Sequence, residues 1–153
     1  MDIEHINSFK DLFDNIYKGN QVATRLSFEL LDYAHLWDDL IDRDTPVSDE
    51  SINRVMLSAL TSISCSSLWG PHLATIVQSA YFRWHAANNI ERNKASTDND
   101  LAKAWMLRAG LYDVFVLIAA KLYGQEWAES VSVKVYGLYG EQLADFIKEI
   151  RNA

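Results

Sequence analysis

The stretch "DDLID", Asp38 to Asp42, holds three aspartates at a spacing that suits shared chemistry on a helix. Asp39 and Asp38 lie three and four residues before Asp42, so helical geometry makes each of them a neighbour of Asp42. Two buried carboxylates about 6 Å apart repel by roughly 3 kcal/mol at an effective dielectric near 20, and a proton or a cation relieves that repulsion. Mg²⁺ is the natural cation, because it binds carboxylates, waters and phosphate oxygens. The spacing of Asp38, Asp39 and Asp42 therefore permits a metal site but does not require one.

The helix that carries these aspartates has two unlike sides. At about 100° per residue, one arc is acidic and holds Asp32, His35, Asp38, Asp39 and Asp42, and the other is an expected core face of Leu26, Leu30, Tyr33, Ala34, Leu36, Trp37, Leu40 and Ile41. The acidic arc is either a solvated face or a partly covered one. Phe28 and Leu31 share it, which favours partial cover and adds Asp32 to the candidate metal ligands.

Two further segments hold polar residues that suit a site. Asp113 stands in "LRAGLYDVFVLIAAKL", which is apolar nearly all round the helix, so its carboxylate needs a partner. A core salt bridge and a metal-ligand or acid/base role are both open. In "RWHAANNIERNK", Asn89 and Arg92 share a face with two other polar side chains, His85 and Asn88. This face is either simply polar or a contact for substrate phosphate oxygens.

The net charge of −7 comes from one segment. Residues 29–50 hold eight acids and one base, whereas the rest of the chain has thirteen of each. Such a balance argues against a nucleic-acid partner, because phosphate backbones need a basic surface. It favours cations or a basic partner.

The periodicity of the 153 residues predicts a single all-helical domain, residues 1–153, folded as an antiparallel bundle. The six expected helices cover residues 3–17, 21–43, 48–65, 70–93, 99–123 and 126–151. The N-terminus lacks the features of a signal peptide and no apolar run is long enough to span a membrane, so we expect a cytoplasmic protein. The single cysteine, Cys65, is expected in the core.

Two motifs resemble a known family. "DDLID" is similar to the first aspartate-rich motif, D-D-x-x-D, of the all-helical isoprenoid (polyprenyl diphosphate) synthases. "GLYGEQLAD", from Gly137 to Asp145, resembles their later G-x-x-G-x-Q-x-x-D helix, and glycines three apart within a helix suggest a close helix approach. The resemblance covers something like the N-terminal half of such a domain. The family's paired arginines and its second aspartate-rich motif are missing.

If the resemblance is real, it implies a helical bundle in which Asp38, Asp39 and Asp42 are the catalytic residues and hold Mg²⁺ against a diphosphate substrate. A second subunit would then complete a dimer. Substrate contacts would then come from Arg43, Asn89, Arg92 and Gln142, and whether the substrate is processed is left open. One alternative is an all-helical nucleotide pyrophosphohydrolase similar to the MazG and dUTPase families, which use acidic pairs and Mg²⁺. The other is a non-enzymatic helical interaction module whose acidic face meets a basic partner.

Overall fold

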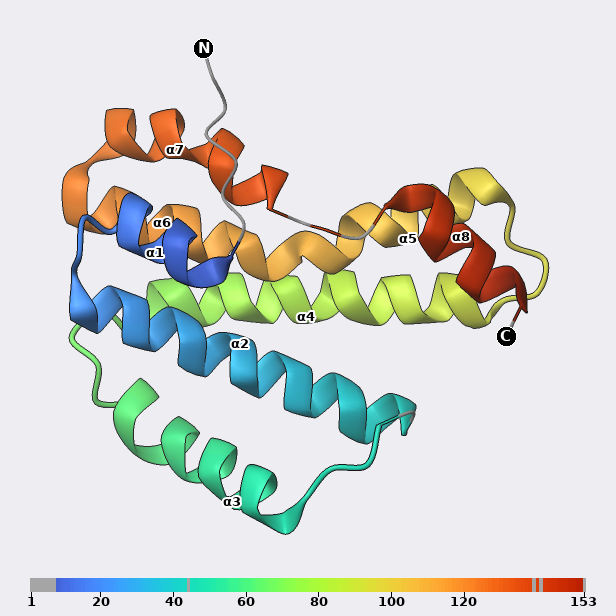
Figure 1. Cartoon of the computed structure of the whole chain (residues 1–153), viewed down its shortest axis with the longest axis horizontal. Coiled ribbons are helices and arrows are strands. Elements are labelled where there is room, and N and C mark those ends of the chain that lie inside the picture. Colours follow the sequence, from blue (N-terminus) through green and yellow to red (C-terminus); the bar gives the residue numbers. More distant parts are fainter. Residues whose placement is uncertain (1–7, 44, 139, 141, 153) are drawn as a thin grey trace. The chain divides into compact units, whose positions relative to one another are not determined.

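The computed structural model describes residues 8–43, 45–138, 140 and 142–152, and the regular structure among them is entirely helical (Figure 1). The α-helices are α1 (Phe9–Ile16), α2 (Gln21–Asp42), α3 (Asp49–Ser58), α4 (Pro71–Arg92), α5 (Asp98–Arg108), α6 (Tyr112–Tyr123), α7 (Gln125–Gly137) and α8 (Leu143–Asn152). A π-helical turn (Ala59–Ile63) follows α3, and a 3₁₀ turn (Ala109–Leu111) joins α5 to α6. The all-helical class is confirmed. None of the described helices is both long and apolar enough to cross a membrane.

In the first half of the chain, the bounds of α2 and the start of α4 lie within one residue of the prediction. The expected start of the first helix at residue 3 lies outside the described residues, and the helix expected over 48–65 changes after Ser58 to the π-helical turn that ends at Ile63. Asn20 caps α2, since its side chain accepts a hydrogen bond from the Ala23 amide, and Ser48 caps α3 in the same way. Helix α2 ends at Asp42 because Arg43 takes the left-handed conformation, with φ at 58°. Pro71 is the first residue of α4, the position in a helix that proline favours.

The second half is more broken than predicted, so the expected count of six helices is not confirmed. The 3₁₀ turn interrupts the expected 99–123 helix, and the expected 126–151 helix stops at Gly137 and resumes at Leu143. The close helix approach expected at Gly137 is wrong, because a Cβ added there meets nothing within 4 Å. At Gly140 it would meet only the Leu138 carbonyl oxygen, at an ordinary 3.5 Å. These glycines lie where one helix ends, and Gln142 immediately precedes the next.

The chain forms two compact units. The N-terminal unit, Phe9–Pro71, holds α1, α2, α3 and the π-helical turn. Within it, Phe13 of α1 packs edge-on against Phe28 of α2, and the buried Tyr17 hydroxyl lies 2.8 Å from Ser27 Oγ. Phe28 and Leu31 were expected to mark partial cover on the acidic arc. The contact of Phe28 and the burial of Leu31 confirm it. The prediction of one domain over residues 1–153 stays a prediction.

The C-terminal unit, from His72 onward, holds α4 to α8. Helices α6 and α7 form a hairpin around Gly124, and α8 packs on α5 (Figure 1). Its core cluster consists of Ala87, Leu101, Ala104 and Phe146. The close glycine contact of this unit is at Gly110, where an added Cβ would lie 3.1 Å from the Ala80 Cα and 3.3 Å from its Cβ. Gly110 therefore lets the 3₁₀ turn approach the backbone of α4.

We predict that Gly110→Val destabilises the protein by about 1–3 kcal/mol, because overpacking a tight helix contact moves the backbone. Gly137→Val is the matched control, since an added Cβ there has open space. Urea unfolding measures both variants. Equal urea midpoints for Gly110→Val and the wild type would show that α4 can move aside without loss of stability.

A buried ion pair joins α4 to α5. Arg108 donates two hydrogen bonds to Glu91, at 2.8 and 2.6 Å, and a third of 2.9 Å to the side-chain oxygen of Asn88. The side chains of Glu91 and Arg108 are only 9 % and 19 % exposed. A guanidinium of this kind compensates a carboxylate that water cannot reach.

Arg108→Met should therefore cost about 3–5 kcal/mol of unfolding free energy, because it leaves the Glu91 carboxylate buried beside an apolar side chain. Lys103→Met is the control, since the Lys103–Asp100 pair on the same helix is exposed. Its thermal midpoint should match the wild type. Equal thermal midpoints for Arg108→Met and Lys103→Met would show that the ion pair between α4 and α5 does not stabilise the C-terminal unit.

Candidate functional site

Helix α3 and the π-helical turn make polar contacts with α2 beside the buried Val55. Arg54 of α3 donates a 2.6 Å hydrogen bond to Asp32 of α2. One helical turn earlier in α2, Glu29 accepts a 2.6 Å bond from the Ser62 hydroxyl and a 3.1 Å bond from Arg25. Because Ser62 pairs with Glu29 while the earlier Arg54 pairs with the later Asp32, the two helices run antiparallel.

The π-helical turn has a local cause in the serine and threonine run that follows Leu57. The Thr61 hydroxyl donates to the Leu57 carbonyl at 2.7 Å, and the Ser64 hydroxyl donates to the Leu60 carbonyl at 2.8 Å. Such bonds to the preceding turn loosen and bend a helix. The turn brings the Ser62 hydroxyl to Glu29, so it sets the far end of the α2–α3 contact.

A polar pocket of about 260 Å³ lies between α2 and the N-terminal half of α3, and we call it the aspartate pocket. Its lining is Asp32, His35, Leu36, Asp39, Pro46, Val47, Ser48, Ser51, Arg54 and Val55. The Asp39 carboxylate makes no hydrogen bond or ion pair with another residue that the structure describes. The pocket thus joins an uncompensated carboxylate to the Arg54 guanidinium.

The three aspartates of "DDLID" do not all line this pocket. Asp39 lines it, whereas Asp38 and Asp42 do not, and Asp42 is exposed at the last position of α2. Among the described residues no group of three or more His, Cys, Asp or Glu side chains could hold a metal ion. The cause is helical geometry, since 100° per residue turns Asp38 away from a pocket that Asp39 faces. Asp32 is the second carboxylate that shares this pocket.

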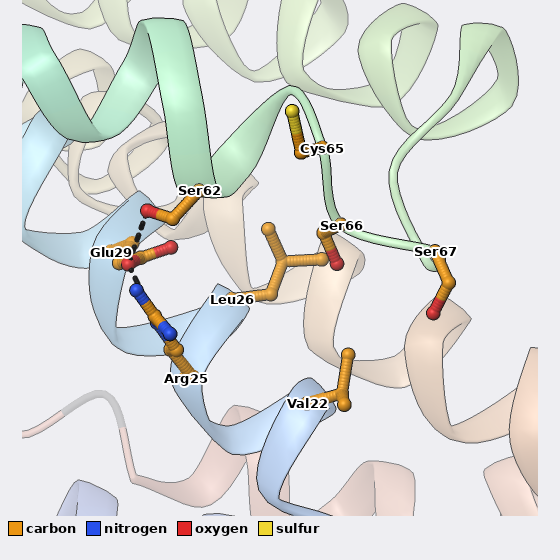
Figure 2. A pocket seen from close by; sticks show the side chains of 8 residues that line it. All are labelled: Val22, Arg25, Leu26, Glu29, Ser62, Cys65, Ser66 and Ser67. Atoms are coloured by element: carbon orange, nitrogen blue, oxygen red, sulfur yellow. Dashed lines mark hydrogen bonds and ion pairs between the residues drawn. The ribbon is translucent and has the colours of Figure 1, made fainter.

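Sequence reasoning missed a second pocket, of about 420 Å³, at the other end of the α2–α3 contact (Figure 2). It is lined by Val22, Arg25, Leu26, Glu29, Ser62, Cys65, Ser66 and Ser67. Figure 2 shows Glu29 bonded to both Arg25 and Ser62 at its edge. Cys65 is exposed, so its expected place in the core is wrong. The π-helical turn ends at Ile63, so Cys65 lies beyond the helix. The serines on either side of Cys65 could have indicated an exposed position.

Asp113 lies in the C-terminal unit and both of its carboxylate oxygens have partners. Arg83 of α4 donates to one oxygen at 2.6 Å, and the Tyr136 hydroxyl of α7 donates to the other at 2.8 Å. Of the two alternatives, the structure shows the salt bridge, but the Asp113 side chain is 36 % exposed and the pair does not lie in the core. Asp113 thus links α4, α6 and α7, and these two contacts satisfy its carboxylate without the need for a metal ion.

The remaining candidates do not line either pocket. Asn89 and Arg92 are exposed on α4, and Asn89 bonds to His85 at 3.1 Å. Arg43 follows α2 and Gln142 precedes α8, and both residues are exposed. Their roles as substrate contacts stay predictions.

The Asp113 cluster makes a pH-dependent prediction. Desolvation of the Tyr136 hydroxyl, together with its hydrogen bond to Asp113, raises the pKa of Tyr136 to about 12, although the residue is 45 % exposed. A raised tyrosine pKa stabilises the fold below the usual value near 10 and loses that stabilisation as the pH rises from 10 to 12. Ultraviolet titration of wild type against Tyr136→Phe isolates this ionisation. Asp113→Asn should move it down towards 10, and an unmoved titration would contradict the contact.

Comparison with known proteins adds no relative to this description. No protein-family model, no curated protein and no solved structure matches the chain. The function is therefore argued from the α2–α3 geometry.

Proposed function

We propose that this chain binds a diphosphate-bearing small molecule together with Mg²⁺ in the aspartate pocket between α2 and α3. One observation supports this above all: Asp39 and Arg54 line the same pocket. A carboxylate offers a place for the cation and a guanidinium offers one for phosphate oxygens, so a magnesium diphosphate finds complementary charge at both ends.

Arg54 suits phosphate because its guanidinium presents several N–H donors in a plane. Its present partner, Asp32, is an exposed one, since the two side chains are 46 % and 60 % exposed. Exposed pairs contribute about 0–1 kcal/mol, so a phosphate can replace or join the Asp32 carboxylate at little cost. The Ser51 hydroxyl lines the same wall and adds one donor at the start of α3, since Ser48 Oγ already donates to Ser51 Oγ at 3.0 Å.

The carboxylates of the aspartate pocket fit Mg²⁺ only when phosphate oxygens complete the ligand set. Among the described residues, no group of three or more His, Cys, Asp or Glu side chains could hold a metal ion by itself. Mg²⁺ keeps several waters and commonly uses one or two carboxylates with substrate phosphates, which Asp39 and Asp32 could supply from one helix. When bound, the ion neutralises phosphate charge. Asp38 and Asp42, though part of the motif, lie outside this arrangement.

Isothermal calorimetry with pyrophosphate, with and without Mg²⁺, tests the proposal. We expect binding that requires Mg²⁺, and Asp39→Asn and Arg54→Gln should each weaken it about 10- to 100-fold, the loss of a charge-assisted contact. Asp42→Asn and Arg43→Gln are the charge-matched controls, because neither residue lines the pocket. The pocket proposal predicts wild-type binding for both, whereas the family resemblance predicts a loss for both. Both test residues form only exposed contacts or none, so the variants should keep the wild-type melting temperature.

The controls also decide between sites. Equal losses for Asp42→Asn and Asp39→Asn would place the metal on the whole motif and overturn the pocket. Pyrophosphate that fails to bind with Mg²⁺ would overturn the function itself. Prenyl diphosphates and nucleoside triphosphates, titrated in parallel, separate the isoprenoid-synthase resemblance from the nucleotide pyrophosphohydrolase alternative.

A further inference from the structure

The outer face of α3 and its π-helical turn carries an exposed apolar stripe. Leu57 is 62 % exposed, Leu60 is 77 % exposed and Met56 is 40 % exposed. At about 100° per residue, these three side chains fall roughly opposite Ser51, which lines the aspartate pocket on the inner face. We call Met56, Leu57 and Leu60 the outer stripe.

The side of α3 that faces α2 combines polar and apolar residues. It presents Ser51 and Arg54 to the aspartate pocket and buries Val55. A surface helix ordinarily turns its apolar stripe inward and its polar side chains to water. Here Val55 is turned inward but two leucines face outward, and their exposed side chains gain nothing from the folding of this chain. Large exposed apolar groups rimmed by polar residues mark interaction surfaces.

Charge identifies the kind of partner. Asp49 and Glu50 are exposed in the first turn of α3, on the same helix as the outer stripe. They end the segment 29–50, which carries the whole net charge of the chain. A second copy would bring an equally acidic segment to the contact, whereas a basic partner gains both apolar burial and electrostatic attraction.

We propose that the outer face of α3 binds a basic amphipathic helix of a partner protein. Leucines of that helix would cover the outer stripe, and its lysines or arginines would meet Asp49 and Glu50. Apolar anchors on successive turns are the recognition mode of helices that bind a protein surface. This surface is separate from the aspartate pocket, which lies on the inner face of α3, so the inference does not rest on the proposed function.

Fluorescence anisotropy with a labelled 18-residue peptide of leucine and lysine, patterned as an amphipathic helix, tests the surface. We expect wild-type protein to bind it, and the double variant Leu57→Ser, Leu60→Ser to bind at least about tenfold more weakly because two leucines lose their burial. Val133→Ser is the control, since Val133 of α7 is also 62 % exposed but lies in the C-terminal unit. Asp49→Asn with Glu50→Gln should weaken binding and reduce its salt dependence.

Several results would overturn the proposal. Equal affinity for the double variant and the wild type, no binding of the peptide, or equal binding of a leucine and glutamate peptide would each do so. Light scattering tests the other possible occupant of the stripe, a second copy of the chain. A wild-type dimer that becomes a monomer in the double variant would assign the stripe to that second copy. Far-ultraviolet circular dichroism confirms that the variants fold, as substitution of exposed side chains should allow.

Discussion

The polar contact of α3 with α2 is the constraint from which both candidate surfaces follow. The contacts of Arg54 with Asp32 and of Ser62 with Glu29, together with the burial of Val55, show which side of α3 faces α2. With these side chains inside, the leucines of the same helix must face out. The aspartate pocket and the outer stripe are thus two consequences of one orientation, and an α3 rotated by half a turn would have neither.

That orientation also changes the meaning of the aspartate-rich motif. A helix can show only part of a D-D-x-x-D sequence to one neighbour, and α3 lies against Asp39. The charge that matters for the pocket is therefore the balance of Asp32 and Asp39 against Arg54, which is far from the −7 of the whole segment. A cation alone has weak reason to enter, whereas a cation and a phosphate together satisfy both signs.

The sequence predicted what local chemistry decides and failed where packing decides. The caps at Asn20 and Ser48 and the start at Pro71 were predictable, because each depends on a few adjacent residues. A pattern of apolar residues predicts a face that can be buried, but it does not show which other element will cover that face. The expected core arc of α2 is buried at Leu26, Leu30 and Leu36, but Trp37, Leu40 and Ile41 are exposed. Gly110 likewise looked ordinary, since only the approach of Ala80 makes it necessary.

Weak attachment of α3 links its two faces. Within α3 and the π-helical turn, Val55 and Ile63 are the buried apolar residues, and the ion pair to α2 is exposed. Two buried apolar side chains and an exposed ion pair are few contacts for a helix of this length, so we expect α3 to open more readily than the core helices. A ligand that joins Asp39 to Arg54 would bind only when α3 is docked, and a partner on the outer stripe would order the same helix. By linkage, each would then favour the other, although the two never touch.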